Sequence, residues 1–165
     1  MNKDKANEAL EVCMHQATSL GAREADGIVR CSVGTSVRVR KGDVETVEQE
    51  NVEGLGIRVV WGGSQASAST MDLNHDRLKE FVTRVVDLAK ATGKDSAVSL
   101  PDRELYMGEE MWEDDSDDSV REIAVDDLRD LAVATETAGF EVDSRIDNSE
   151  GAEASAGAYG IAYAD

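Results

Sequence analysis

The stretch LGIRVVWGGSQASAST at residues 55–70 decides the fold class of this chain. Its large apolar side chains stand at every second position from Leu55 to Trp61, which is the period of a β-strand with one buried face. Gly62 and Gly63 then form a two-residue connection that tolerates positive φ, as hairpin turns require. The alternating small residues at 64–70 provide the returning strand, so the sequence predicts an antiparallel hairpin.

Two more strands are expected before this hairpin. The first begins at Asp26, carries Val29, Cys31 and Val33 on one face, and continues past Gly34 to residue 39. A turn at residues 41–43 leads to a more polar strand over residues 44–52, which Gly54 separates from the strand at 55–61. The four strands together predict an antiparallel meander.

Three amphipathic helices are expected around the strands. Each is recognised by apolar residues at three- and four-residue steps, and the first and second are followed by Gly21 and Gly93 as stop signals. Asp72 or Asn74 can cap the second helix, and Asp126 and Asp127 suit the first turn of the third. The expected core positions are Ala6, Ala9, Leu10, Cys13, Met14, Ala17 and Leu20, then Leu78, Phe81, Val82, Val85, Val86 and Ala89, then Leu128, Leu131, Ala132, Thr135 and Ala138.

Two carboxy-terminal strands complete the prediction, one over residues 140–146 and one beginning after Gly151. The expected fold is α+β, with an antiparallel sheet of mixed strand order and about six strands packed with three helices. In the last strand, Tyr159, Ile161 and Tyr163 share one face, and small residues from Ala158 to Ala164 share the other. We expect this small face to pack against a layer outside the chain, and residues 1–165 to be one domain of a longer protein, cut at or near a domain boundary.

Composition narrows the possible partners. The formal net charge of −18 disfavours binding to nucleic acid or to an anionic membrane surface, because both need a concentrated positive face. No uncharged run reaches the ~20 apolar residues of a membrane span. Cys13 and Cys31 lack metal-type spacing and are expected to be buried, reduced thiols. Residues 102–122 are expected to form an acidic loop, since seven of the ten residues from Glu109 to Asp118 are acidic.

The sequence motifs that could indicate catalysis or metal binding are all incomplete. His15 and His75 have no second histidine or carboxylate at ligand spacing, and a water-activating zinc site needs about three protein ligands. The segment from Asp115 to Ser119 resembles a calcium loop, but Val120 stands where that loop needs glycine. Ser64 lies in a hairpin and not in a strand-to-helix elbow. No catalytic or metal-binding residue is therefore assigned.

Three blocks of sequence carry a specific resemblance. Gly54-Leu55-Gly56-Ile57-Arg58-Val59-Val60, Ala68-Ser69-Thr70-Met71-Asp72-Leu73 and Arg145-Ile146-Asp147-Asn148-Ser149-Glu150-Gly151-Ala152 resemble, in order and spacing, the amino-terminal domain of the TldD/PmbA family, also called modulators of DNA gyrase. Residues 89–101 and 148–151 are more similar to the PmbA (TldE) branch. Ala66 departs from the glycine that many members have.

The resemblance implies a cytoplasmic zinc peptidase built from TldD and TldE subunits that degrades unfolded or leader peptides. Its metal is held by a His-Glu-x-x-x-His helix of the TldD subunit, a motif absent from this chain. The expected role of this domain is to wall the peptide chamber and to pack against its own carboxy-terminal domain and a TldD-like or identical partner subunit.

Arg58 and the exposed edge of the meander are the candidates for contact with an extended peptide by strand addition. In the alternative, Arg58 pairs with an acid of the neighbouring strand such as Glu48 or Glu50. Two other functions stay open: the front part of an active TldD-type zinc peptidase, and an acidic binding module for gyrase or a basic protein.

Overall fold

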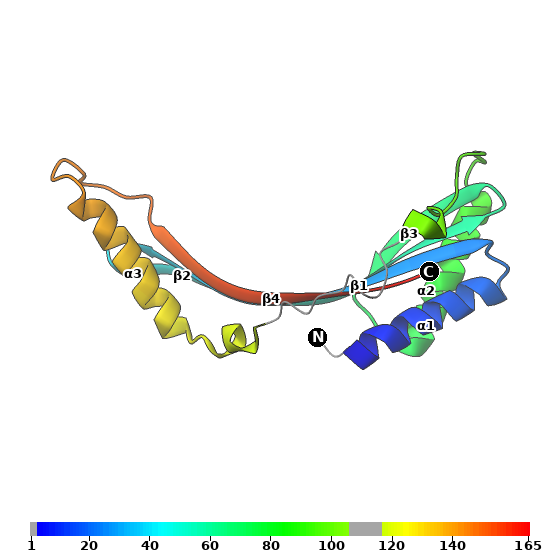
Figure 1. Ribbon diagram of the computed structural model, residues 1–165, viewed down its shortest axis with the longest axis horizontal. Helices are drawn as coiled ribbons and strands as arrows, with labels where there is room; N and C mark the ends of the chain where they lie inside the picture. The colour runs from blue at the N-terminus through cyan, green and yellow to red at the C-terminus, as the bar shows by residue number, and fades with distance from the viewer. Residues whose placement is uncertain (1–2, 106–116) are drawn as a thin grey trace. The chain divides into compact units, whose positions relative to one another are not determined.

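The computed structural model describes residues 3–105 and 117–165 (Figure 1). Within these ranges the chain forms an antiparallel sheet and three α-helices, as expected for an α+β fold. The elements in chain order are α1 (Lys3–Ser19), β1 (Glu24–Arg40), β2 (Asp43–Trp61), β3 (Ser64–Thr70), α2 (His75–Ala91), the 3-10 helices η1 (Arg103–Leu105) and η3 (Asp118–Glu122), α3 (Val125–Glu141) and β4 (Ala152–Ala164). None of the helices is long and apolar enough to cross a membrane within the described part of the chain.

The sheet has the strand order β3-β2-β1-β4. Lys41 and Gly42 join β1 to β2 with φ of 52° and 82°, the pair of positive values that a type I′ hairpin turn needs. The chain then returns through Gly62 and Gly63 into β3, and Trp61 lies opposite Ser64. The predicted hairpin at residues 55–70 is confirmed.

Over residues 3–105 and 117–165 the sheet has four strands and not about six. The expected strands at 44–52 and 55–61 are one continuous strand, β2, because Gly54 stays in extended pairing and does not break it. Glycine weakens a strand interior but does not end it when a neighbouring strand supplies continuous hydrogen bonds.

The expected strand at residues 140–146 is also wrong. Helix α3 runs through Gly139 to Glu141, and a turn follows in which the Ile146 amide donates to the Asp143 carbonyl at 2.9 Å. The Arg145 guanidinium binds both carboxylate oxygens of Asp143, at 2.9 and 2.7 Å. Local side-chain bonds of this kind favour a turn over a strand.

The chain forms two compact units, each with its own core. The first consists of the described parts of Met1–Cys31, Val52–Asp114 and Gly160–Asp165, and the second of those of Ser32–Asn51 and Asp115–Tyr159. In the first unit, α1 and α2 bury their predicted stripes against β1, β2 and β3; in the second, Leu128 and Ala132 of α3 cover Val37 and Val39. Leu131, an expected core residue, is 59% exposed, and Glu136 takes the buried position on α3.

Part of the small face of β4 is covered from within the chain, because Ala162 and Ala164 pack against the core of the first unit. For these two residues, the expectation of a layer from outside the chain is wrong. The opposite face is the exposed one, with Tyr159, Ile161 and Tyr163 at 76%, 43% and 40% of their full exposure. Alanines on β4 are short enough to let α1 approach the sheet closely, whereas the tyrosines are not.

Candidate peptide-binding and partner-contact site

Arg58 lies on the face of the sheet opposite the two helices of the first unit. Its Nε and Nη2 donate to Oδ1 and Oδ2 of Asp26 at 2.8 and 3.0 Å, a bidentate pair between β2 and β1. The Tyr163 hydroxyl of β4 donates to Oδ2 of the same aspartate at 3.4 Å. A planar guanidinium fits a carboxylate in this way, so the group links three strands on one face.

The prediction that Arg58 pairs with Glu48 or Glu50 is wrong. Glu48 and Glu50 precede Arg58 on the same strand, because residues 44–61 form one strand, and so they do not lie beside it on a neighbouring strand. The actual partner, Asp26, comes from β1. Contact between Arg58 and a peptide stays a prediction.

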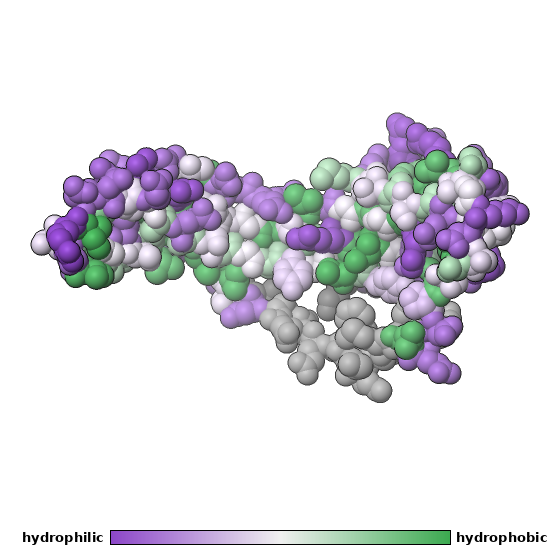
Figure 2. Space-filling model, turned by 90° about the horizontal axis from the view of Figure 1, so that it is seen from above, coloured by the Kyte–Doolittle hydropathy of each residue, from purple (hydrophilic) through white to green (hydrophobic). Residues whose placement is uncertain are grey.

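Apolar side chains surround the ion pair on this face. Ile28 and Ile161 are each 43% exposed, and Tyr163 is 40% exposed. Ile28 lies over Gly56, since a Cβ added to that glycine would be 3.5 Å from Cγ2 of Ile28. Figure 2 shows hydrophobic residues interleaved with hydrophilic ones over the visible side of the unit that carries α1 and α2. An exposed apolar face around an oriented ion pair has the composition of an interaction surface.

The edge strand β3 leaves a second surface open. It stands at one end of the strand order, with no described strand on its far side. The pairs Trp61–Ser64, Val59–Ala66 and Ile57–Ala68 hold β3 to β2. Because bonded pairs recur at every second residue from a two-residue turn, the backbone groups of Gln65, Ser67 and Ser69 point away from β2.

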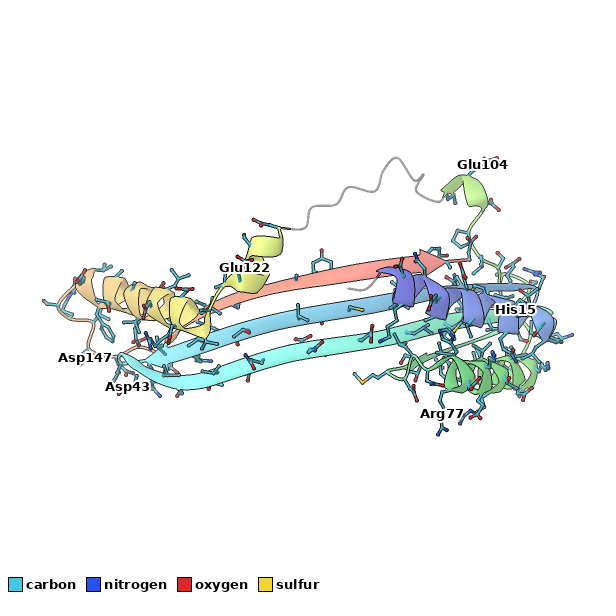
Figure 3. All side chains as sticks on the ribbon, turned by 90° about the horizontal axis from the view of Figure 1, so that it is seen from below. His15, Asp43, Arg77, Glu104, Glu122 and Asp147 are labelled. Carbon is cyan, nitrogen blue, oxygen red and sulfur yellow. The ribbon has the colours of Figure 1, made fainter. Side chains whose placement is uncertain are left out.

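A groove of about 460 Å³ runs between this edge and α2. From α2 it is lined by Phe81, Val85 and Leu88, with Arg77 and Arg84 beside them. From β3 and the following turn it is lined by Ala68, Ser69, Thr70 and Asp72. Arg77 projects outward from α2 in Figure 3. The groove combines an apolar wall with an open strand edge.

Neither cysteine has the character of a nucleophile. Burial raises the pKa of the Cys13 thiol to about 11. Burial also raises the pKa of Cys31, helped by the charge of Glu53, whose Oε1 accepts from Sγ at 3.6 Å. A hydrogen bond from Lys5 is the main reason that the pKa of Glu53 is lowered. Both thiols therefore stay protonated near neutral pH, and only thiolates attack. Neither cysteine forms a disulfide; Cys13 is buried as predicted, whereas Cys31 is only half-buried.

The histidines do not assemble a metal site. His15 lies exposed on α1, where Figure 3 labels it. His75 of α2 has one carboxylate nearby, Oε2 of Glu8 at 3.9 Å from Nε2, and both side chains are more than half exposed. Over residues 3–105 and 117–165, no three histidine, cysteine, aspartate or glutamate side chains gather closely enough to hold a metal ion. The segment that resembles a calcium loop lies partly outside the described residues, as does most of the acidic loop at 102–122.

The fold and these surfaces define an α+β domain whose open antiparallel sheet exposes one face and one edge strand. A family model described as PmbA/TldA metallopeptidase domain 1 matches residues 29–89. The chain is 32% identical over 154 residues to the Metalloprotease PmbA homolog of Haemophilus influenzae, an alignment that covers 91% of this chain and 33% of the relative. It is also 32% identical to Metalloprotease PmbA of Escherichia coli, with 86% of this chain and 32% of that protein covered.

Two solved structures share the fold. A protein described as a modulator of DNA gyrase from Bacteroides thetaiotaomicron superposes with a TM-score of 0.77 at 22% identity, over 99% of this chain and 41% of its own. TldE from Thermococcus kodakarensis superposes with a TM-score of 0.72 at 16% identity, over 94% of this chain and 35% of its own. The chain belongs to the PmbA/TldD family and corresponds to its amino-terminal domain. It spans about a third of the length of the curated relatives.

Sequence reasoning located Arg58 and the open edge but missed their surroundings. Asp26 and Tyr163 lie far from Arg58 in sequence and meet it only through the β4-β1-β2 order. The sequence indicated the groove only weakly, since α2 contains more apolar residues than a single buried stripe needs. Leu88 is 53% exposed, although it stands between the buried Val85 and Ala89.

Proposed function

We propose that this chain is the amino-terminal domain of a PmbA (TldE)-type subunit of a cytoplasmic metallopeptidase that acts on unfolded or leader peptides. The PmbA names of the relatives and the TldE fold support the branch. In this proposal the zinc belongs to a TldD-type partner subunit. The domain supplies a chamber wall and an interface, and its own residues perform no bond cleavage.

The exposed face around Asp26 and Arg58 is the observation that carries the interface role. Ile28, Ile161 and Tyr163 expose apolar surface, and burial of such surface drives association. The bidentate pair of Arg58 and Asp26 is already oriented for a polar contact at the centre of this face. The proposed occupant is the carboxy-terminal domain of the same polypeptide, since the relatives are about three times as long as this chain.

Association in trans tests this role. The remaining two thirds of the full-length protein, produced separately, should bind the 165-residue chain. Ile161→Asp should weaken that binding by at least about tenfold, because it places a charge in an apolar contact. Val142→Asp is the matched control, since Val142 is 78% exposed in the other compact unit. Equal binding by both variants would contradict the interface role.

Metal analysis tests the non-catalytic role. The full-length protein is needed, because residues 1–165 lack the metal motif under either alternative. Purified without a partner subunit, it should contain no stoichiometric zinc and should not cleave an unfolded peptide such as reduced casein. One tightly bound ion per chain, with cleavage abolished by a chelator, would favour the active TldD-type alternative. A His-Glu-x-x-x-His motif in the downstream sequence would favour the same alternative.

A further inference from the structure

The open edge of β3 presents a regular set of unused backbone groups. Ser67 and Ser69 each turn an N–H and a C=O away from β2, as does Gln65. Residues two apart in a strand place these groups about 7 Å apart, which is the repeat of another extended strand. The serine side chains are small, so a second backbone can approach Ser67 and Ser69 to strand-pairing distance. An extended polypeptide matches this edge, whereas a helix does not.

The groove beside that edge adds an apolar wall. Phe81, Val85 and Leu88 stand at helical spacing on the side of α2 that faces β3. Val85 is almost fully buried, but Leu88 keeps 53% of its exposure. A strand added to β3 would send every second side chain towards this wall. An aliphatic or aromatic side chain there would remove Leu88 and Phe81 from water.

The groove is close to neutral, whereas the chain as a whole is strongly acidic. Arg77 and Arg84 line it with one acid, Asp72, whose Oδ1 is already occupied by the Asn74 amide at 3.0 Å. Glu80 lies 3.9 and 3.8 Å from the two guanidinium groups, so two cations share one carboxylate there. The whole chain carries −18. An acidic side chain on the bound segment therefore meets two guanidinium groups here and avoids the acidic excess of the rest of the chain.

We propose that β3 and α2 form a binding site for an extended peptide, which adds as a strand to Ser67 and Ser69, packs an apolar side chain on Phe81 and Leu88, and places an acidic side chain near Arg77 and Arg84. This site goes beyond the proposed function, because it rests on the groove and not on the peptidase assignment. Recognition of this kind takes its affinity from backbone bonds and its selectivity from the alternate side chains.

Nuclear magnetic resonance on the 165-residue chain tests the site. The probe is the blocked peptide acetyl-Thr-Leu-Thr-Val-Glu-amide, added to millimolar concentration. The expected result is saturable shifts of the Ser67 and Ser69 amides and of the α2 residues that line the groove. Shifts confined to β4 or to the β1–β2 hairpin, or no saturable shifts, would overturn the proposal.

Matched variants test the three contacts separately. Ser69→Pro removes one outward N–H without removing a β2–β3 bond and should weaken binding about fivefold relative to Ser69→Ala. Leu88→Asn should weaken it about tenfold, while Leu131→Asn, a similarly exposed leucine on α3, should not. Arg84→Gln should weaken it about threefold more than Lys79→Gln, since Lys79 carries the same charge on α2 but does not line the groove.

N-methylation of the peptide tests strand addition without altering the protein, so the result does not depend on whether a protein variant folds. N-methylation of successive peptide residues should abolish binding at alternate positions only, because only every second amide of an added strand faces β3. Uniform tolerance of N-methylation would overturn strand addition even if the peptide binds. If the peptide does not bind β3, the remaining polypeptide can still bind the 165-residue chain in trans. The two experiments therefore test the peptide site and the interface role independently.

Discussion

Glu136 is the buried carboxylate of the second unit, and it holds the β1–β2 turn. Its Oε1 and Oε2 accept from the amides of Lys41 and Gly42, each at 2.9 Å. These two amides lie in the left-handed turn and have no strand partner, so the carboxylate satisfies both. The Gly42 amide, followed by that of Lys41, is the main reason that the pKa of Glu136 is lowered.

The lowered pKa predicts a pH dependence of stability. A carboxyl whose pKa is depressed by folding stabilises the fold above its unfolded pKa and loses that contribution as the pH falls through the folded value. Glu136→Gln should therefore lower the free energy of unfolding at pH 7. The difference from the parent chain should shrink below the ordinary glutamate pKa of about 4.3. Urea unfolding between pH 3 and pH 7 measures it, with exposed Glu141→Gln as the control. A difference that does not vary with pH would contradict the carboxylate's role.

At the scale of elements, the helices and the hairpin were readable from the sequence because each has a local cause. The stripe from Ala6 to Ala17 is buried in α1, and Asn74 caps α2 by accepting from the amides of Asp76 and Arg77 at 3.1 and 3.3 Å. The errors came from glycine. Gly54 does not interrupt β2, and α3 continues through Gly139 into the region where a strand over residues 140–146 is expected. Neighbouring strands and helix packing outweigh the local preference of glycine at both positions.

Two glycines of the second unit should respond oppositely to the same change. Gly139 lies inside α3 with open space at its Cβ position, so Gly139→Ala should stabilise the protein by up to about 1 kcal/mol. Gly151 has φ of 101°, and an added Cβ would lie 2.5 Å from the Val39 carbonyl oxygen. Gly151→Ala should destabilise it by about 1–3 kcal/mol. Urea denaturation of both variants measures the signs, and equal signs would contradict this account of α3 and of the start of β4.

At the scale of the whole molecule, the two cores differ in size. The core of the first unit joins α1, α2 and four strands, including the buried Leu10, Leu55, Leu78 and Val82. Among the described residues of the second unit, the buried apolar core consists of Val37, Val39, Leu128, Ala132 and Ala154. Opening free energy follows buried apolar contact, so the units should differ in local stability.

Hydrogen exchange should resolve this difference. Under native conditions, the amides of Val82 and Val86 in α2 should exchange at least about tenfold more slowly than those of Ala132 and Val133 in α3. Val39→Ala should speed exchange in α3 more than in α2. Equal protection of the two helices would show that the chain opens only as one cooperative unit.

The charge of the chain predicts a response to salt. A formal net charge of −18 over 165 residues opposes compaction by self-repulsion, and screening shortens the Debye length from about 30 Å at 0.01 M to about 8 Å at 0.15 M. The melting temperature should therefore rise over this range, equally in NaCl and KCl. A constant or falling melting temperature would show that attractive ion pairs such as Asp26–Arg58 outweigh the repulsion.

The sequence by itself determined the α+β class, the three amphipathic helices, the turn at Gly62–Gly63 and the resemblance to the family, because periodicity, caps and turn residues act over a few positions. It also singled out Arg58 as a candidate contact residue. Only the tertiary structure decided that residues 43–61 form one strand, that Asp26 binds Arg58, and that the tyrosine face of β4 is the exposed one. These outcomes depend on which strands become neighbours, and strand order is set by the packing of residues distant in the chain.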